Sequence, residues 1–280
     1  MGIELGKINT LKVSRRVDFG LYLSDDEGEN EVLMPKRYTS AEMRVNDLVD
    51  AFVYNDSEDR LVATTERPYA KVGEFALLRV KSVSNVGAFL DWGLMKDLLV
   101  PFREQKTRMT SGRSYIVYVY VDDATNRIVA SAKIDKFLDN KMPSFDSFEE
   151  VNLLVAQRTD LGFKVIINNL FSGMIYHNQI FQDINIGDKL TGYIKNVRAD
   201  GKIDVVLGKK EKSRVAELAD SILSFLARNH GVMRITDASS PDEIQAVFQC
   251  SKKDFKKALG FLFKQHLVDL SDKNAVKLVK

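Results

Sequence analysis

The sequence predicts a mainly β protein with an α/β C-terminal module: three tandem five-stranded barrels of the OB type, followed by a winged-helix domain. Two observations carry this prediction. Five landmarks recur at nearly fixed offsets along most of the chain, and the hydrophobic period becomes helical after residue 212. Recurrence of this kind indicates tandem copies of one small structural unit. We therefore expect domains at residues 1–66, 67–134, 146–209 and 212–280.

The landmarks keep the same order in each repeat. Gly20, Gly87 and Gly162 each follow a short alternating segment, at offsets of 67 and 75. The same offsets relate Arg60, Arg127 and Lys202, each of which follows a polar turn and precedes an apolar segment. Between these ends, each repeat has an apolar triplet closed by Pro35, Pro101 or Tyr176, then a turn pair and a further strand.

Each repeat contains short segments with period-two alternation, bounded by Gly, Asn and Asp turns, which is typical of β-strands. Five such strands in about 65–70 residues favour a small closed barrel of the OB type. The charged segment Asp135–Ser147 contains Met142-Pro143-Ser144 and predicts a linker between the second and third repeats.

The C-terminal module predicts a helix, a helix-turn-helix and a hairpin, which is the winged-helix order. An apolar stripe from Val215 to Leu226 has spacings of three and four. Ser240-Pro241-Asp242-Glu243 combines a capping serine, a proline at the first helical position and a glutamate three residues after the cap. A further helix begins after Ser251, and two short apolar segments near the C-terminus predict the hairpin.

Composition limits the possible classes of protein. Lys and Arg number 41 against 39 Asp and Glu, so the net charge of +2 gives no overall indication of a polyanionic partner. One cysteine, Cys250, excludes an internal disulfide and favours a reducing compartment. The first residues lack the pattern of a secretory signal, and no segment has the roughly 18 consecutive apolar residues of a membrane helix. We expect a cytoplasmic protein without a membrane partner, and a monomer.

The second repeat resembles the S-one RNA-binding domain, an OB-type module. The resemblance rests on three segments, Val83–Asp91, Asp97–Pro101 and Asp123–Ile128. The whole order of three such units and a winged helix resembles the CvfB family of bacterial RNA-binding proteins. The resemblance implies binding of single-stranded RNA, through base stacking on aromatic rings and basic side chains along the backbone.

The resemblance also implies site residues: two aromatics three residues apart, a histidine after the third strand, and an Asp–Arg pair four residues apart. The first repeat keeps Phe19, Tyr22, Asp56 and Arg60. The second keeps Phe89, Asp123 and Arg127, has Val86 at the first aromatic position, and has Trp92 three residues after Phe89. The third has Leu161 and Lys164 at the aromatic positions with Phe163 between them, and Arg198 and Lys202 where the others have Asp and Arg. Pro35, Pro101 and Tyr176 replace the histidine, and Tyr176 retains a stacking surface.

The C-terminal module adds a basic helix face. Lys252, Lys253, Lys256 and Lys257 fall on one arc of about 140°, opposite the apolar face. Residues 212–280 carry 12 Lys and Arg against 8 Asp and Glu, a net charge of +4. This concentration suits phosphate contact. An ordinary solvated helix face is the second interpretation, and a winged helix of this kind also suits duplex DNA.

Several site residues have a structural interpretation as well. A small barrel needs aromatic residues in its own core, so Phe19, Phe89 and Phe163 also fit core positions. An Asp–Arg pair at this spacing also braces a turn, and Trp92 equally fits an interface between neighbouring barrels.

The sequence does not predict an enzyme, a cofactor or a metal site. His177, His230 and His266 lie far apart, and the chain lacks a phosphate-cradling loop and metal-spaced Cys and His residues. Three functions remain: an RNA-binding regulator of expression, an adaptor associated with the ribosome or a protein, and a DNA-binding regulator that uses the winged helix.

Overall fold

The computed structural model describes residues 2–141, 143–146, 148–180, 182–208, 211–272 and 274–279. The chain folds into two compact units, Met1–Leu138 and Asp139–Lys280. Met142 and Ser147, which belong to the expected linker, lie outside the described residues. No helix in the described part of the chain combines the length and apolar character needed to cross a membrane.

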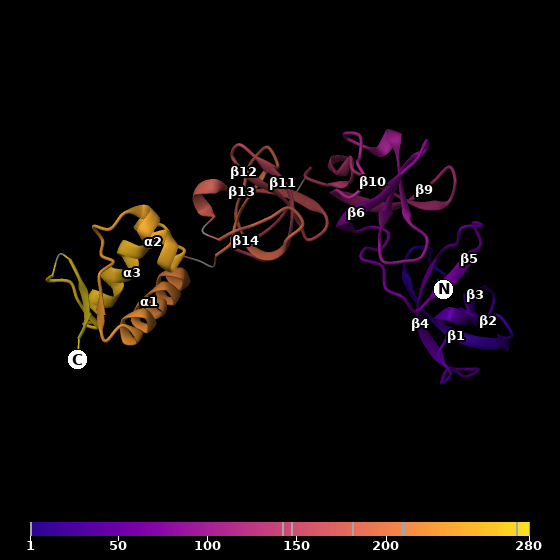
Figure 1. The fold of residues 1–280 in the computed structure, drawn as a ribbon, viewed down its shortest axis with the longest axis horizontal. Coiled ribbons are helices and arrows are strands. Elements are labelled where there is room, and N and C mark those ends of the chain that lie inside the picture. The colour runs from indigo at the N-terminus through magenta and orange to yellow at the C-terminus, as the bar shows by residue number, and fades with distance from the viewer. Residues whose placement is uncertain are drawn as a thin grey trace. The chain divides into compact units, whose positions relative to one another are not determined.

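The N-terminal unit contains two closed five-stranded barrels (Figure 1). The strand order of the first is β1-β2-β3-β5-β4, formed by β1 (Ile8–Val17), β2 (Gly20–Ser24), β3 (Glu31–Pro35), β4 (Leu48–Asn55) and β5 (Leu61–Thr64). The second comprises β6 (Phe75–Val83), β7 (Gly87–Asp91), β8 (Leu98–Pro101), β9 (Ser114–Asp122) and β10 (Arg127–Ser131). Short 3₁₀ helices follow β3, β8 and β10: η1 (Lys36–Tyr38), η2 (Phe102–Glu104) and η3 (Ile134–Phe137).

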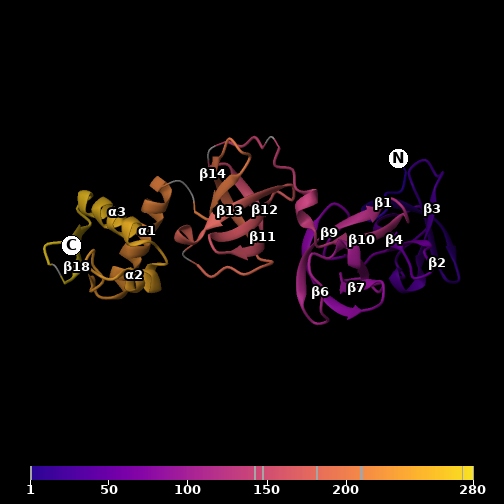
Figure 2. The same ribbon diagram turned by 90° about the horizontal axis from the view of Figure 1, so that it is seen from above.

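The C-terminal unit contains the third closed barrel and the winged helix (Figure 2). The barrel is formed by β11 (Glu150–Thr159), β12 (Gly162–Ile167), β13 (Phe171–Tyr176), β14 (Lys189–Val197) and β15 (Ile203–Val206), with η4 (His177–Gln179) after β13. The winged helix comprises α1 (Glu211–Arg228), β16 (Val232–Met233), α2 (Pro241–Phe248), α3 (Lys252–Lys264), β17 (Val268–Asp269) and β18 (Val276–Leu278). The predicted fold class is therefore confirmed.

The three barrels close in the same way. In each, the first strand is irregular at the same place: Ser14, Lys81 and Ala156 fall at the register shifts. A bulge of this kind bends a strand, and small barrels need such bends to close. The last strand then pairs in parallel with the third, as Leu33 does with Val62.

The repeated glycine lies where two strands approach closely. A Cβ added at Gly20, Gly87 or Gly162 would lie 2.1, 2.3 or 1.9 Å from a carbonyl oxygen of the neighbouring strand. No side chain fits at such a distance, so the strand hairpin requires glycine at its start. Glycine therefore recurs at this position of each repeat for a steric reason.

One hydrophobic cluster joins the first and second barrels, and the first barrel has a further core of its own. Trp92 packs edge-on against Phe52 with ring centroids 5.8 Å apart, and both belong to one buried cluster with Tyr54 and Val62. The indole Nε1 of Trp92 donates a hydrogen bond of 2.6 Å to the carbonyl oxygen of Lys96. Because the apolar surfaces of both barrels are buried against each other, we expect this unit to unfold cooperatively.

The winged helix has a separate core. Ile222 and Leu226 of α1, Ile244 of α2 and Phe255 of α3 belong to one buried cluster. Both short helices begin with a capping serine. The hydroxyl of Ser240 accepts a hydrogen bond from the N–H of Glu243 within a capping box, and Ser251 caps α3 through the N–H of Asp254. These caps fix where α3, and with it the lysine face, begins.

We predict that Gly87→Ala destabilises the N-terminal unit strongly. Because the added methyl group would meet main-chain atoms of β8, the strand must shift, and overpacking of this kind costs about 3 kcal/mol of unfolding free energy. Urea unfolding followed by the fluorescence of Trp92, the only tryptophan, measures the loss.

Gly28→Ala is the matched control. Gly28 has φ +73° and no atom within 4 Å of an added Cβ, so only left-handed backbone strain of about 1 kcal/mol is expected. An equal or larger loss for Gly28→Ala would contradict the steric explanation.

Candidate nucleic-acid interface

An open groove of about 770 Å³ crosses the first barrel. Three residues selected from the sequence, Phe19, Tyr22 and Arg60, line it together. Leu33 and Val62 are among the apolar residues beside them. Phe19 is 58% exposed and therefore lies on the surface rather than in the barrel core. The groove thus combines aromatic faces, an apolar wall and a guanidinium group, which suits a base and its phosphate.

The two aromatic rings form a small cluster with Arg15. Phe19 and Tyr22 meet edge to face, with ring centroids 6.5 Å apart. The guanidinium of Arg15 lies 3.7 Å from the centroid of the Tyr22 ring and pairs with Glu31 at 2.8 Å. Hydrogen bonds from Ser14 and then from Arg15 lower the pKa of the Glu31 carboxyl. One face of Tyr22 is therefore already covered by a cation.

Arg15 and Arg37, which lines the same groove, were not predicted from the sequence. The position of Arg15 was predictable, because β1 and β2 are joined by a tight turn. Counting back from that turn pairs Arg15 with Tyr22, as the structure has them.

The turn after β4 holds Arg60 at the groove. Asp56 accepts hydrogen bonds from the N–H groups of Glu58 and Arg60, and its carboxylate also accepts two from the Arg60 side chain, at 2.9 and 2.6 Å. Burial by itself would raise the pKa of Asp56, but these hydrogen bonds lower it. The pair therefore braces the turn, and Arg60 still remains 65% exposed in its side chain.

The second barrel uses the corresponding residues differently. Arg127 forms an ion pair with Asp59 of the first barrel. The expected pairing of Arg127 with Asp123 is wrong, because strands β9 and β10 pair in a register that puts Asp122, not Asp123, opposite Arg127. Asp122 instead pairs with Arg103 at 2.9 Å. Phe89 is half-buried at the position that Tyr22 has in the first barrel.

Two residues selected as stacking residues are buried. Trp92 is 2% exposed in the core shared by the first two barrels, and Phe163 is 8% exposed in the core of the third. Successive residues of a strand face opposite ways, so Phe163 points inward where Lys164 points outward. The same alternation separates Trp92 from Phe89, three residues earlier. Stacking of a base on either Trp92 or Phe163 is therefore contradicted, and both belong to the core.

The third barrel gathers Tyr176 and Arg198 on its outer face. Arg198 donates a hydrogen bond of 2.6 Å to the Tyr176 hydroxyl and two more to the carboxylate of Asp204, at 2.9 and 3.1 Å. Asp204 was missed, and it compensates much of the positive charge that the sequence indicated here. Lys202 pairs with Asp200 at 2.7 Å, and Lys164 is half-buried.

The four lysines of α3 are not all opposite its apolar face, because Lys256 lines one hollow together with the buried Leu259. Lys252 is tied to the preceding turn, donating a hydrogen bond of 2.7 Å to the carbonyl oxygen of Ser239. Lys256 lies 3.5 Å from Asp237, and its side chain is 52% exposed. Lys253 is exposed, and Lys257 is half-buried. The two most accessible cations of this face are thus Lys253 and Lys256.

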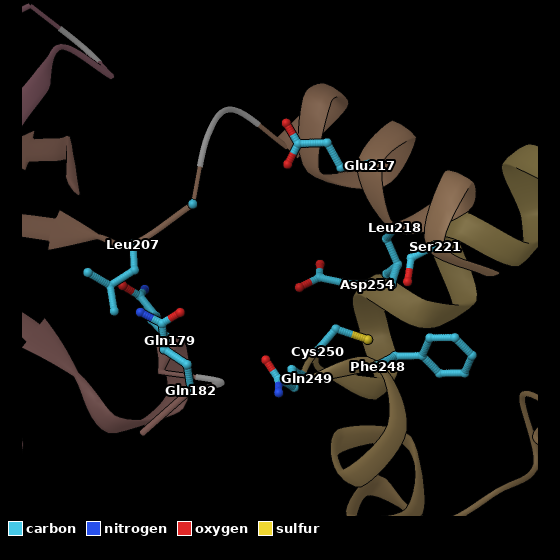
Figure 3. A pocket seen from close by; sticks show the side chains of 11 residues that line it. Gln179, Gln182, Leu207, Glu217, Leu218, Ser221, Phe248, Gln249, Cys250 and Asp254 are labelled. Atoms are coloured by element: carbon cyan, nitrogen blue, oxygen red, sulfur yellow. The ribbon is translucent and has the colours of Figure 1, made fainter. Parts of the chain in front are cut away.

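A second hollow lies in the C-terminal unit. Figure 3 shows Glu217, Leu218 and Ser221 of α1 on one side of it and Cys250 at the α2–α3 junction. Its described lining contains Glu217 and Asp254 but no Lys or Arg, so it does not suit a phosphate. Among the described residues, no group of three or more His, Cys, Asp or Glu side chains could hold a metal ion.

Residues 5–66 match the S1 domain family, and residues 220–278 match the CvfB-like winged helix domain family. The uncharacterized protein YitL of Bacillus subtilis (strain 168) is 28% identical over 276 residues, which cover 92% of this chain and 89% of the relative. Conserved virulence factor B of Staphylococcus aureus (strain COL) is 20% identical over 274 residues, covering 95% and 91%.

Among solved structures, the chain is similar to a multidomain protein with nucleic acid binding domains from Streptococcus pneumoniae TIGR4. The two share 23% sequence identity with 98% of each chain covered and a TM-score of 0.42. The S1 domain match, the CvfB-like winged helix match and the similarity to the conserved virulence factor B proteins along most of the chain support the resemblance of this chain to the CvfB family.

Proposed function

We propose that this chain binds single-stranded RNA without catalysing a reaction, and that it regulates gene expression after transcription. The observation that carries the proposal is the groove of the first barrel, where Phe19, Tyr22 and Arg60 line one surface. Stacking on exposed rings tolerates any base, while an arginine fork matches a phosphate. The match of residues 5–66 to the S1 domain covers this same barrel.

Two further surfaces support the proposal. Tyr176 and Arg198 stand together on the third barrel, and Lys253 and Lys256 project from α3. Several weak contacts on one chain raise the overall affinity through effective concentration, provided that one RNA reaches them together. Phe89 of the second barrel is a weaker candidate contact, because it is half-buried.

Binding of duplex DNA through α3 is the second candidate function. The exposed lysines on the second helix of the helix-turn-helix favour it, because that helix is the one that enters a major groove in such domains. An adaptor role is the third, and the use of Arg127 in an ion pair between barrels favours it.

Fluorescence anisotropy with a labelled single-stranded RNA and a duplex DNA of equal length, each across a salt series, tests these functions. Tighter, salt-sensitive binding of the RNA is the expected result. Tighter binding of the duplex would instead support DNA binding through the winged helix. An absence of binding to both at low salt would leave the adaptor role.

We predict that Phe19→Ala weakens RNA binding about 5- to 150-fold, which corresponds to about 1–3 kcal/mol for one stacked base. Tyr69→Ala is the control, because Tyr69 is similarly exposed, at 64% against 58% for Phe19, but lies outside the groove. Anisotropy titrations at constant salt measure both affinities, and equal effects of the two substitutions would contradict the assignment of the groove.

We also predict that the double substitution Lys253→Gln and Lys256→Gln makes RNA binding less sensitive to salt. Each phosphate contact of a single strand contributes about 0.7 to the slope of log affinity against log salt, so the slope should fall by about 1.4.

The double substitution Arg228→Gln and Arg234→Gln is the control for the lysine face. It removes the same charge from two exposed positions of the winged helix that lie outside α3. The same fall in slope for the control pair would mean that general charge, rather than the lysine face, attracts the RNA.

A further inference from the structure

Two side chains of the second barrel contact the turn Asp56–Arg60 of the first barrel, which presents Arg60 at the groove. Lys96 Nζ donates a hydrogen bond of 2.6 Å to the carbonyl oxygen of Asp56 and lies 3.5 Å from the carboxylate of Asp59. Arg127 forms an ion pair with the same carboxylate. Two cations of the second barrel therefore contact a single five-residue turn of the first.

The geometry of this turn determines the direction of the Arg60 side chain. Asp56 and Arg60 close it through main-chain and side-chain hydrogen bonds, and both line the groove. Asp59, at φ +62°, has a left-handed backbone that is uncommon for a residue other than glycine. Such a conformation persists where surrounding contacts hold it, and Lys96 and Arg127 are contacts of that kind.

We propose that Lys96 and Arg127 are positioning residues for RNA binding: they hold the turn Asp56–Arg60 so that Arg60 stays at the groove, and they do not contact RNA themselves. The inference rests on the proposed function of the groove. It also reassigns Arg127, which occupies the repeat position of Arg60 but reaches the neighbouring barrel instead of its own outer face. Arg127 of the second repeat therefore supports the turn Asp56–Arg60 of the first repeat, although it occupies the position that contacts RNA in the first.

The salt dependence of binding separates positioning from contact. A residue that neutralises a phosphate contributes to the slope of log affinity against log salt. A residue that only raises the population of the binding-competent turn changes the affinity by that population, and the slope is unchanged because Arg60 still contacts the phosphate in the bound complex. In the full-length chain, with a labelled 12-nucleotide single-stranded RNA, Lys96→Met and Arg127→Met should each weaken binding about 3- to 10-fold without changing the slope. Arg60→Met should lower the slope by about 0.7.

Lys106→Met is the matched control. Lys106 also belongs to the second barrel and also forms an ion pair, with Asp135 at 3.6 Å, so its loss removes the same charge without freeing the turn. Amide hydrogen exchange at Arg60 in the RNA-free chain should also be faster in Lys96→Met than in Lys106→Met.

Three outcomes would overturn the proposal. Affinities of Lys96→Met and Arg127→Met within twofold of Lys106→Met would show that the turn needs no support. A fall in slope of about 0.7 for either would show direct phosphate contact. If Phe19→Ala and Arg60→Met both leave RNA binding unchanged, the groove itself is not the RNA site, and the positioning role falls with the proposed function.

Discussion

The close approach of neighbouring main chains at one glycine in each barrel is the constraint on which the barrel architecture depends. Gly20, Gly87 and Gly162 each lie against a carbonyl oxygen of the next strand, at a distance that excludes any side chain. This contact sets the register of the second and third strands. Register in turn decides which side chains face outward, since a shift of one residue would exchange the two faces. Tyr22, two residues after Gly20, is therefore presented on the outer face by the barrel closure itself.

The shared core of the first two barrels explains most of the differences between them. Once Trp92 packs against Phe52, the β7–β8 loop of the second barrel lies against the β4–β5 turn of the first, and Lys96 and Arg127 come within reach of Asp59. Surface ion pairs of this kind contribute at most about 1 kcal/mol each. The apolar contact therefore holds the barrels together, and the charges refine the position of one turn.

Most cations on the candidate faces already have an acidic partner. Arg15 pairs with Glu31, Arg198 with Asp204 and Lys202 with Asp200. The cation of each pair is exposed, by 41–72% of its side chain, so exchanging a carboxylate for a phosphate costs little. The near-neutral net charge of the chain is thus compatible with nucleic-acid binding at local sites, and the groove of the first barrel offers the most complete set of groups.

The sequence by itself determined the repeat, the barrel class, the winged helix and the candidate face of the first barrel. These properties follow from local rules: strand alternation, turn residues, helix caps and a glycine whose position recurs. Phe19, Tyr22 and Arg60 were therefore predictable as neighbours, because each occupies a fixed place in one repeat. Only the tertiary structure decided that Trp92 fills an interface, that Phe163 turns inward, that Arg127 reaches Asp59 and that Asp204 compensates Arg198. The positions of Trp92 and Arg127 depend on contacts with Phe52 and Asp59, which lie far from them in the chain, and a periodic pattern contains no information about which segments meet. The outcomes for Phe163 and Asp204 depend on the strand register, which decides the face to which each side chain points.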